Sequence, residues 1–206
     1  MMNIISKIWI PVLVCIGLIT WQCRRQPGFT AQERALIAGP DSLMAVCTMP
    51  SDSAFLHTPC IDLGPRELQS AQLQTLLAKM KYTVQDPSQD GVGIAAPQVG
   101  IGRRIVCVQR LDKPGEPFEC YLNIRLDSLW GPMRQGREGC LSVPGLRGLV
   151  TRHSGVTVSY IHPGTLQPCQ EQVEGFTAVI FQHECDHLDG ILYTSKADSL
   201  WVVSER

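Results

Sequence analysis

His183-Glu184-Cys185-Asp186-His187 predicts an α-helix that presents two histidines on one face. Because an α-helix turns once every ~3.6 residues, side chains four positions apart lie on the same side of it. The two imidazoles can therefore bind one metal ion, and Glu184 is placed to take a proton from a water that the ion activates. The apolar residues 176–182 are suited to bury such a helix, and Gly190 favours its end. A surface helix that carries these residues by chance is the alternative.

Glu138-Gly139-Cys140-Leu141-Ser142 offers a third metal ligand. Metal sites that hydrolyse their substrates usually have three protein ligands and one open position. The Cys140 thiolate is chemically suited to join His183 and His187, and the glycine before it leaves the backbone free to present the thiolate. For any one of the nine cysteines, a buried and unreactive thiol is the alternative.

The glycine-rich segment Gly91-Val92-Gly93-Ile94-Ala95-Ala96-Pro97-Gln98-Val99-Gly100 precedes a predicted strand over residues 104–108. Small residues allow the backbone to approach another group closely. The amide N–H of Gln98 could stabilise a developing oxyanion. The alternative is a turn with no chemical role. A phosphate-binding loop is disfavoured, because there is no G-x-G-x-x-G pattern and no Lys-Ser/Thr follows.

Taken together and in this order, the three segments resemble the motifs of the peptide deformylase family. Those motifs are G-x-G-h-A-A-x-Q, E-G-C-L-S and Q-H-E-x-D-H-L-x-G, and they match residues 91–98, 138–142 and 182–190. Ile94 stands where leucine is more usual, and the resemblance spans residues 50–195. It implies a metallo-amidase that hydrolyses the N-formyl group from the N-terminal formyl-methionine of peptides and releases formate.

The resemblance also implies a role for each motif residue. The metal ligands would be Cys140, His183 and His187. The ion would be Fe²⁺ in the usual case, with Zn²⁺, Ni²⁺ or Co²⁺ as alternatives, because a thiolate and two imidazoles suit several transition metals. Glu184 would move the proton as general base and then general acid. The Gln98 side-chain amide and the Leu141 backbone N–H would stabilise the oxyanion.

The same resemblance implies a groove for the N-formylmethionyl peptide. Its lining would include Gly93, Glu138 and Arg147, and the apolar methionine pocket would be formed by Val92, Phe176, Val179 and His183. Asp186 would face away from the metal and pair with Arg152 as an outer brace of the site. For both arginines an ordinary solvated charge is the alternative.

The pattern of apolar residues predicts an α+β fold, with mixed, largely antiparallel sheets around a central metal-binding helix. Further helices are expected over residues 31–37 and 65–81. The expected strands are residues 104–109, 119–123, 126–129, 155–160 and 170–174. Residues 199–203 are short and β-prone, so no C-terminal helix is expected.

An apolar, uncharged stretch covers residues 8–21, with Lys7 before it and Arg24 and Arg25 after it. It is shorter than the ~20 residues of a membrane-spanning helix and better fits the apolar part of a secretory signal. Cys23 then suggests a lipoprotein, although residues 20–22 lack the small side chains that such cleavage prefers. The alternatives are an uncleaved membrane anchor and a buried or interfacial helix. We therefore expect an exported or membrane-associated protein, with a cytoplasmic location as the alternative. The expected division is a leader over 1–27, a linker over 28–50 and a catalytic domain over 51–206.

The chain has 206 residues and a formal net charge of −1, which suits one monomeric domain with no affinity for nucleic acid. In an exported protein some of the cysteines would form disulfides, whose pairing the sequence does not give. Three other functions are less well supported. A catalytically impaired relative would lack one of the residues at the metal, and here all of them are present. A zincin-type peptidase would need a third ligand after His187, where no histidine follows. A structural zinc module would need a C-x-x-C pair, which the sequence does not contain.

Overall fold

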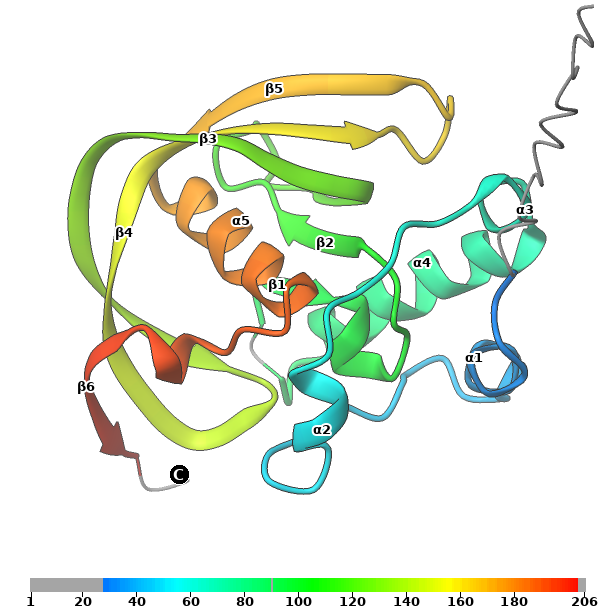
Figure 1. The fold of residues 1–206 in the computed structure, drawn as a ribbon, viewed down its shortest axis with the longest axis horizontal. Helices are drawn as coiled ribbons and strands as arrows, with labels where there is room; N and C mark the ends of the chain where they lie inside the picture. Colours follow the sequence, from blue (N-terminus) through cyan, green and yellow to red (C-terminus); the bar gives the residue numbers. More distant parts are fainter. Residues whose placement is uncertain (1–27, 90, 204–206) are drawn as a thin grey trace, which may run out of the picture.

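The computed structural model describes residues 28–89 and 91–203 (Figure 1). The expected leader over residues 1–27, including Cys23, lies outside the described residues. Within the described part of the chain, no helix is both long and apolar enough to cross a membrane.

A six-stranded antiparallel sheet is the main element of the fold. Its strands are β1 (Gly93–Ala95), β2 (Ile105–Gln109), β3 (Phe118–Cys140), β4 (Val143–Ile161), β5 (Pro168–Glu174) and β6 (Ala197–Val202). They pair in the order β1-β2-β3-β4-β5, and β6 pairs with β4. Among the described residues, the one parallel contact is an isolated bridge between Ile61 and Arg103. The predicted α+β class is confirmed, and β6 stands where we expected a β-prone segment.

β3 and β4 are longer than the sequence pattern indicated. The expected strands over 119–123 and 126–129 are parts of the single strand β3, so their predicted boundaries were wrong. The register between β3 and β4 shifts after Leu122, and Asn123 has a φ of 51°. Such a bulge breaks the alternation of apolar side chains while strand pairing continues beyond it. Both strands curve strongly (Figure 1), which lets β4 pair with β5 at one end and with β6 at the other.

The motif helix α5 (Gly175–Leu188) lies inside the curve of the sheet (Figure 1). Its residues Phe181 and Leu188 are fully buried in a cluster with Val106 of β2 and Val156 of β4. The helix ends as expected, because Gly190 has a φ of 74° and its N–H donates to the carbonyl of His187. The motif helix is thus held at the centre of the fold by apolar contacts on several sides.

A second core cluster lies between the sheet and α4 (Ala71–Gln85). Leu73, Leu76 and Met80 of α4 are completely buried there. The single helix expected over 65–81 is two helices, α3 (Pro65–Leu68) and α4. The break has a local cause, because the Ser70 hydroxyl accepts a hydrogen bond from the N–H of Leu73 at 3.2 Å and begins a new helix.

Residues 28–50, which we expected to form a linker, are packed against the rest of the protein. They contain α1 (Ala31–Ala38), whose Ile37 is buried beside α4. Glu33 of α1 forms a buried ion pair with Arg103 at 3.0 Å, and Arg103 also contacts Glu67 of α3 at 3.4 Å. The short elements α2 (Ser53–Leu56), η1 (Ala96–Val99) and η2 (Tyr193–Ser195) complete the described fold.

A disulfide joins Cys107 of β2 to Cys120 of β3, which lie directly opposite each other in the sheet. Both half-cystines are buried in the cluster under α4. We expect the double variant Cys107→Ala/Cys120→Ala to lose about 2–4 kcal/mol of unfolding free energy in urea, because the crosslink restricts the unfolded chain. Cys169→Ala on β5, a free and only partly buried thiol, is the matched control. Thiol titration of the protein, unfolded without a reducing agent, tests the pairing. A reaction of the thiols of both Cys107 and Cys120 would contradict the disulfide.

Candidate metal centre and active-site cavity

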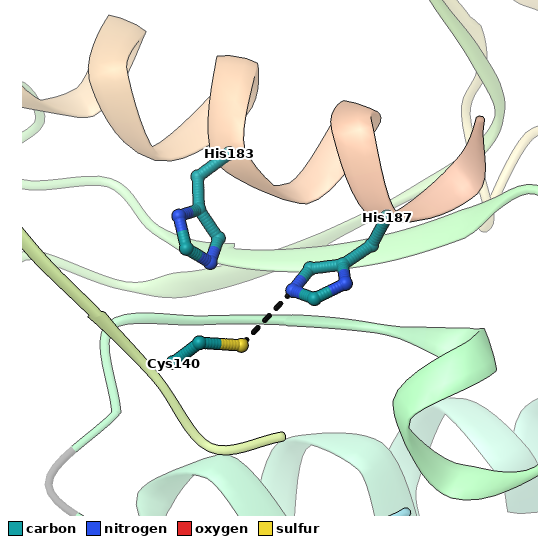
Figure 2. A group of neighbouring side chains, drawn as sticks. All are labelled: Cys140, His183 and His187. Carbon is teal, nitrogen blue, oxygen red and sulfur yellow. Dashed lines mark hydrogen bonds between the residues drawn. The ribbon is translucent and has the colours of Figure 1, made fainter. Parts of the chain in front are cut away.

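Three side chains that could hold a metal ion converge at the end of the β3–β4 hairpin. His183 and His187 project from consecutive turns of α5 toward Cys140, the last residue of β3 (Figure 2). One donor atom from each of the three residues lies within 4.8 Å of the others, and Cys140 Sγ is 3.1 Å from His187 Nε2. The two histidines lie on one face of the helix, as their four-residue spacing predicted. Cys140, which is 47 residues before His187, completes the group.

The donor set suits a divalent cation. Burial would raise the pKa of the Cys140 thiol, but the two imidazoles beside it lower that pKa well below its ordinary value. Burial disfavours the charged form of His183, yet hydrogen bonds with Cys140 and Glu138 raise its pKa to about 10. A thiolate held against an imidazolium can exchange that proton for a metal ion. His183 Nδ1 lies 2.8 Å from Glu138 Oε2, which leaves its other nitrogen for the ion.

A chain of charges supports the ligands from outside. Arg152 donates to both oxygens of Glu138, at 2.7 and 2.9 Å, and to Asp186 Oδ2 at 2.6 Å. Lys196 contacts Asp186 Oδ1 at 2.6 Å. Burial opposes the charge on Glu138, but Arg152 and His183 outweigh it and bring the carboxyl pKa to about 2. The expected pair between Asp186 and Arg152 is confirmed, whereas the Glu138 and Lys196 contacts were not foreseen.

Arg152→Met should destabilise the protein and weaken its metal site. The change removes the guanidinium that contacts both oxygens of the buried Glu138 carboxylate, a loss of roughly 3–5 kcal/mol. Because Glu138 orients His183, metal affinity should fall about 10- to 100-fold. Urea unfolding and a chelator competition titration measure the two effects. Arg134→Met is the control, since Arg134 lies opposite Arg152 on β3 but is exposed. Equal stability of the two variants would contradict the bracing role.

Glu184 lies beside the three donors and is almost completely buried. Burial raises the pKa of its carboxyl to about 7, and its Oε2 has no hydrogen-bond partner among the described residues. Glycine at position 93 leaves room for the Glu184 carboxylate, because a Cβ on residue 93 would lie only 2.5 Å from Glu184 Oε1. The glycine of β1 is therefore required by the close approach of the carboxylate.

Gln98 is held in one orientation by its own loop. Its Oε1 accepts a hydrogen bond from the Ala95 N–H at 2.8 Å, so the amide nitrogen is the end that faces the site. That nitrogen lies 3.4 Å from Cys140 Sγ and 3.3 Å from Ser142 Oγ. Leu141 follows Cys140 in the two-residue turn between β3 and β4, so its backbone N–H belongs to the same corner of the site.

The site opens into a cavity of about 470 Å³. Of the site residues expected from the sequence, the cavity is lined by Val92, Gly93, Gln98, Glu138, Cys140, Leu141, Arg147, Phe176, Val179, His183 and Glu184. Among the expected ligands, His187 alone is not part of the lining. Ile180 and Arg137 also line it but were not expected. The helical spacing could have indicated Ile180, which lies three residues before His183 on the same face.

Tyr193 was also missed. Its ring stacks on the His183 imidazole with centroids 5.9 Å apart, and its hydroxyl donates to the carbonyl of Leu146 at 3.0 Å. Tyr193 lies in η2, after the motif helix has ended. No local pattern in the sequence relates it to His183, because the contact depends on how the chain turns back after α5.

A family model described as polypeptide deformylase matches residues 44–201. The chain belongs to the peptide deformylase family. Among similar proteins, the peptide deformylase of Leptospira biflexa serovar Patoc is 35% identical over 145 residues, which are 67% of this chain and 79% of that deformylase. Peptide deformylase 2 of Pseudomonas syringae pv. tomato is 41% identical over 133 residues, 62% of this chain and 73% of the relative.

Solved structures of deformylases have the same fold. A class I type b peptide deformylase from Acinetobacter baumannii with bound Met-Ala-Ser has a TM-score of 0.66 at 34% identity, covering 75% of this chain and 98% of the other. The actinonin-bound form of that enzyme has a TM-score of 0.68 at 33% identity, covering 76% and 99%. This deformylase is therefore a hydrolase that removes the N-formyl group from peptides, and it belongs to a family of metalloenzymes.

Proposed function

We propose that Cys140, His183 and His187 hold one Fe²⁺ ion and that Glu184 is the proton-transfer residue of the deformylation. The convergence of three donor atoms within 4.8 Å beside an unpartnered buried carboxylate carries this proposal. Zn²⁺, Ni²⁺ and Co²⁺ fit the same donors, so the choice of iron rests on the family resemblance. When bound, the ion supplies Lewis acidity toward water and the formyl carbonyl oxygen.

Glu184 is suited to move a proton in both directions. A carboxyl pKa near 7 lets the group accept a proton from the attacking water and later return it to the leaving amine at neutral pH. Ile180 and Glu184 both pack directly against Gly93, so β1 covers one side of the carboxyl group. Its free Oε2 is the atom that would receive the proton.

Gln98 and Leu141 are proposed to stabilise the negative charge that develops on the formyl oxygen. Because Ala95 fixes the Gln98 amide, its N–H is oriented before the substrate arrives. We expect Gln98→Ala to lower kcat by about 10²–10³-fold with bound metal retained, as measured by formate release and metal analysis. Unchanged kcat would remove Gln98 from the oxyanion site. Gln89→Ala is the control, because Gln89 also lines the cavity but makes no hydrogen bond with the three donor residues.

The methionine side chain is proposed to enter the apolar part of the cavity. Phe176, Val179 and Ile180 come from one side of α5, and Val92 faces them from the segment before β1. Gly93, Glu138 and Arg147 belong to the rest of the lining. Glu138, however, is bound to Arg152 and His183, so its carboxylate serves the metal site more directly than the peptide.

Formate release is the test of the proposed function. The purified protein, kept anaerobic with Fe²⁺, should release formate from formyl-Met-Ala-Ser. Acetyl-Met-Ala-Ser is the matched control and should be left intact, because the added methyl group crowds the carbonyl carbon against the donors. No formate with iron, nickel or cobalt would reject the proposal.

We further propose that residues 1–27 direct this enzyme out of the cytosol or attach it to the membrane, with lipidation at Cys23. The apolar composition of residues 8–21 supports this proposal, and so does the disulfide, because such bonds persist in oxidising compartments. Palmitate labelling of the full chain in cells tests it, with Cys23→Ser as the control. Absence of label on both proteins would remove the lipoprotein proposal. Recovery of the protein in the cytosolic fraction would remove export.

A further inference from the structure

Two arginines on the rim of the active-site cavity have no acidic partner among the described residues. Arg137 of β3 and Arg147 of β4 both line the cavity, and both are exposed. The cavity's acidic side chains within residues 28–89 and 91–203 are Glu138 and Glu184. Glu138 is bound to Arg152, and Glu184 is buried beside the donors. Among residues 28–89 and 91–203, the rim therefore carries two positive charges that no acidic side chain neutralises.

The two guanidinium groups share one side of the β3–β4 hairpin. A Cβ on Gly139 would lie 2.7 Å from Arg147 Cζ, so the Arg147 side chain lies directly across that glycine. Arg137 lies directly opposite Leu149 in the pairing of β3 with β4, and Leu149 is two residues after Arg147 in the regular part of β4, so all three side chains point to the same face. Arg137 and Arg147 are thus neighbours along one edge of the cavity.

Their distance from the reacting group matches the length of a short peptide. An extended strand rises about 3.3 Å per residue, so the three steps from Cys140 back to Arg137 span roughly 10 Å. An extended peptide with its formyl group at the donors covers this distance with about three residues of its own. Arg147, which lies over Gly139, faces the positions between.

We propose that Arg137 and Arg147 make this deformylase prefer peptides with a carboxylate two or three residues after the formyl-methionine. Two sources have the required chemistry: an aspartate or glutamate side chain, and the free C-terminus of a short peptide. The inference rests on the proposed function, because it places the formyl group at Cys140, His183 and His187. The residues that α5 contributes to the lining before His183 are apolar (Phe176, Val179 and Ile180), so they add no charge that would attract a carboxylate.

The expected preference is modest and sensitive to salt. Exposed ion pairs stabilise a complex only slightly, so each carboxylate should raise kcat/KM by about 2- to 10-fold over its neutral counterpart. The ratio should decrease as salt is added, because ions screen exposed charges. A shape effect of the third residue would not depend on salt in this way.

Two pairs of substrates and two variants form the experiment. One pair is formyl-Met-Ala-Asp-amide and formyl-Met-Ala-Asn-amide, which tests a side-chain carboxylate. The other is formyl-Met-Ala-Ser with a free or an amidated C-terminus, which tests the chain end. Arg137→Gln should bring the ratio of kcat/KM within a pair toward one. Arg134→Gln, an exposed arginine of β3 that does not line the cavity, should leave it unchanged.

A preference in either pair that Arg137→Gln removes would support the inference and identify the source of the carboxylate. A ratio at or below one in the unaltered enzyme, or a ratio that Arg137→Gln leaves unchanged, would overturn it while the deformylase activity stands. No formate from any of the four peptides would instead reject the proposed function, and the selectivity with it.

Discussion

Glu184→Ala is expected to keep its metal and lose turnover by at least about 10²–10⁴-fold, the contribution typical of a positioned general acid and base. The variant removes the buried carboxylate whose Oε2 has no partner, while the three donor side chains remain in place. Within the described lining of the cavity, the other acid is Glu138, which is bound to Arg152 and His183. No neighbouring group is therefore placed to substitute for Glu184.

Formate release under saturating substrate measures the loss, and metal analysis of the same sample measures retention. Glu184→Gln is the matched variant, because it keeps the shape and hydrogen-bonding capacity of the side chain but cannot take a proton. Both variants should lose formate release to a similar extent. Full activity in either would rule out Glu184 as the proton-transfer residue, and loss of metal from both would assign it to the binding of the ion instead.

Cys140→Ala is expected to lower metal affinity by more than about 100-fold and to abolish activity. Removing an outer partner of a ligand already costs about 10- to 100-fold in affinity, and Cys140 is itself a donor. The change also removes the one negative charge in the donor set, so His183 and His187 would offer two neutral nitrogens only. Competition with a chelator measures the affinity.

Cys185→Ala is the matched control for this prediction. Cys185 lies between the two histidines in sequence, but it is buried in the core cluster that includes Phe181 and Leu188. Burial raises the pKa of its thiol above the ordinary value, as expected for an unreactive cysteine. The control should cost some stability and keep the metal. Equal metal loss from both variants would indicate that general destabilisation, rather than a missing ligand, is responsible.

The metal site could be predicted from the sequence because its information is largely local. The spacing of His183 and His187 follows from helix geometry alone. Cys140 is different, since nothing in spacing relates it to a histidine 47 residues later, and the family resemblance was required to place it. The pairing of Asp186 with Arg152 was also expected, but helix spacing alone does not identify Arg152 as the partner.

Features that depend on distant pairing could not be predicted. The Cys107–Cys120 disulfide requires the register of β2 against β3, which the nine cysteines of the sequence do not reveal. β1 is three residues long and lies within the glycine-rich segment, where the sequence predicts no strand. The packing of residues 28–50 combines the burial of Phe29, Ile37 and Met44 with the ion pair between Glu33 and Arg103, a residue in no motif. In each case the signal lies in tertiary contacts rather than in local periodicity.

X-ray absorption spectroscopy at the zinc edge of the zinc-loaded protein tests the proposed ion site most directly. The account predicts one sulfur at about 2.3 Å and two imidazole nitrogens at about 2.0–2.1 Å from the ion. Cys140→Ala should lose the sulfur shell, and Cys185→Ala should keep it. A zinc environment of nitrogen and oxygen alone in the unaltered protein would contradict the account, as would a sulfur shell that survives in Cys140→Ala.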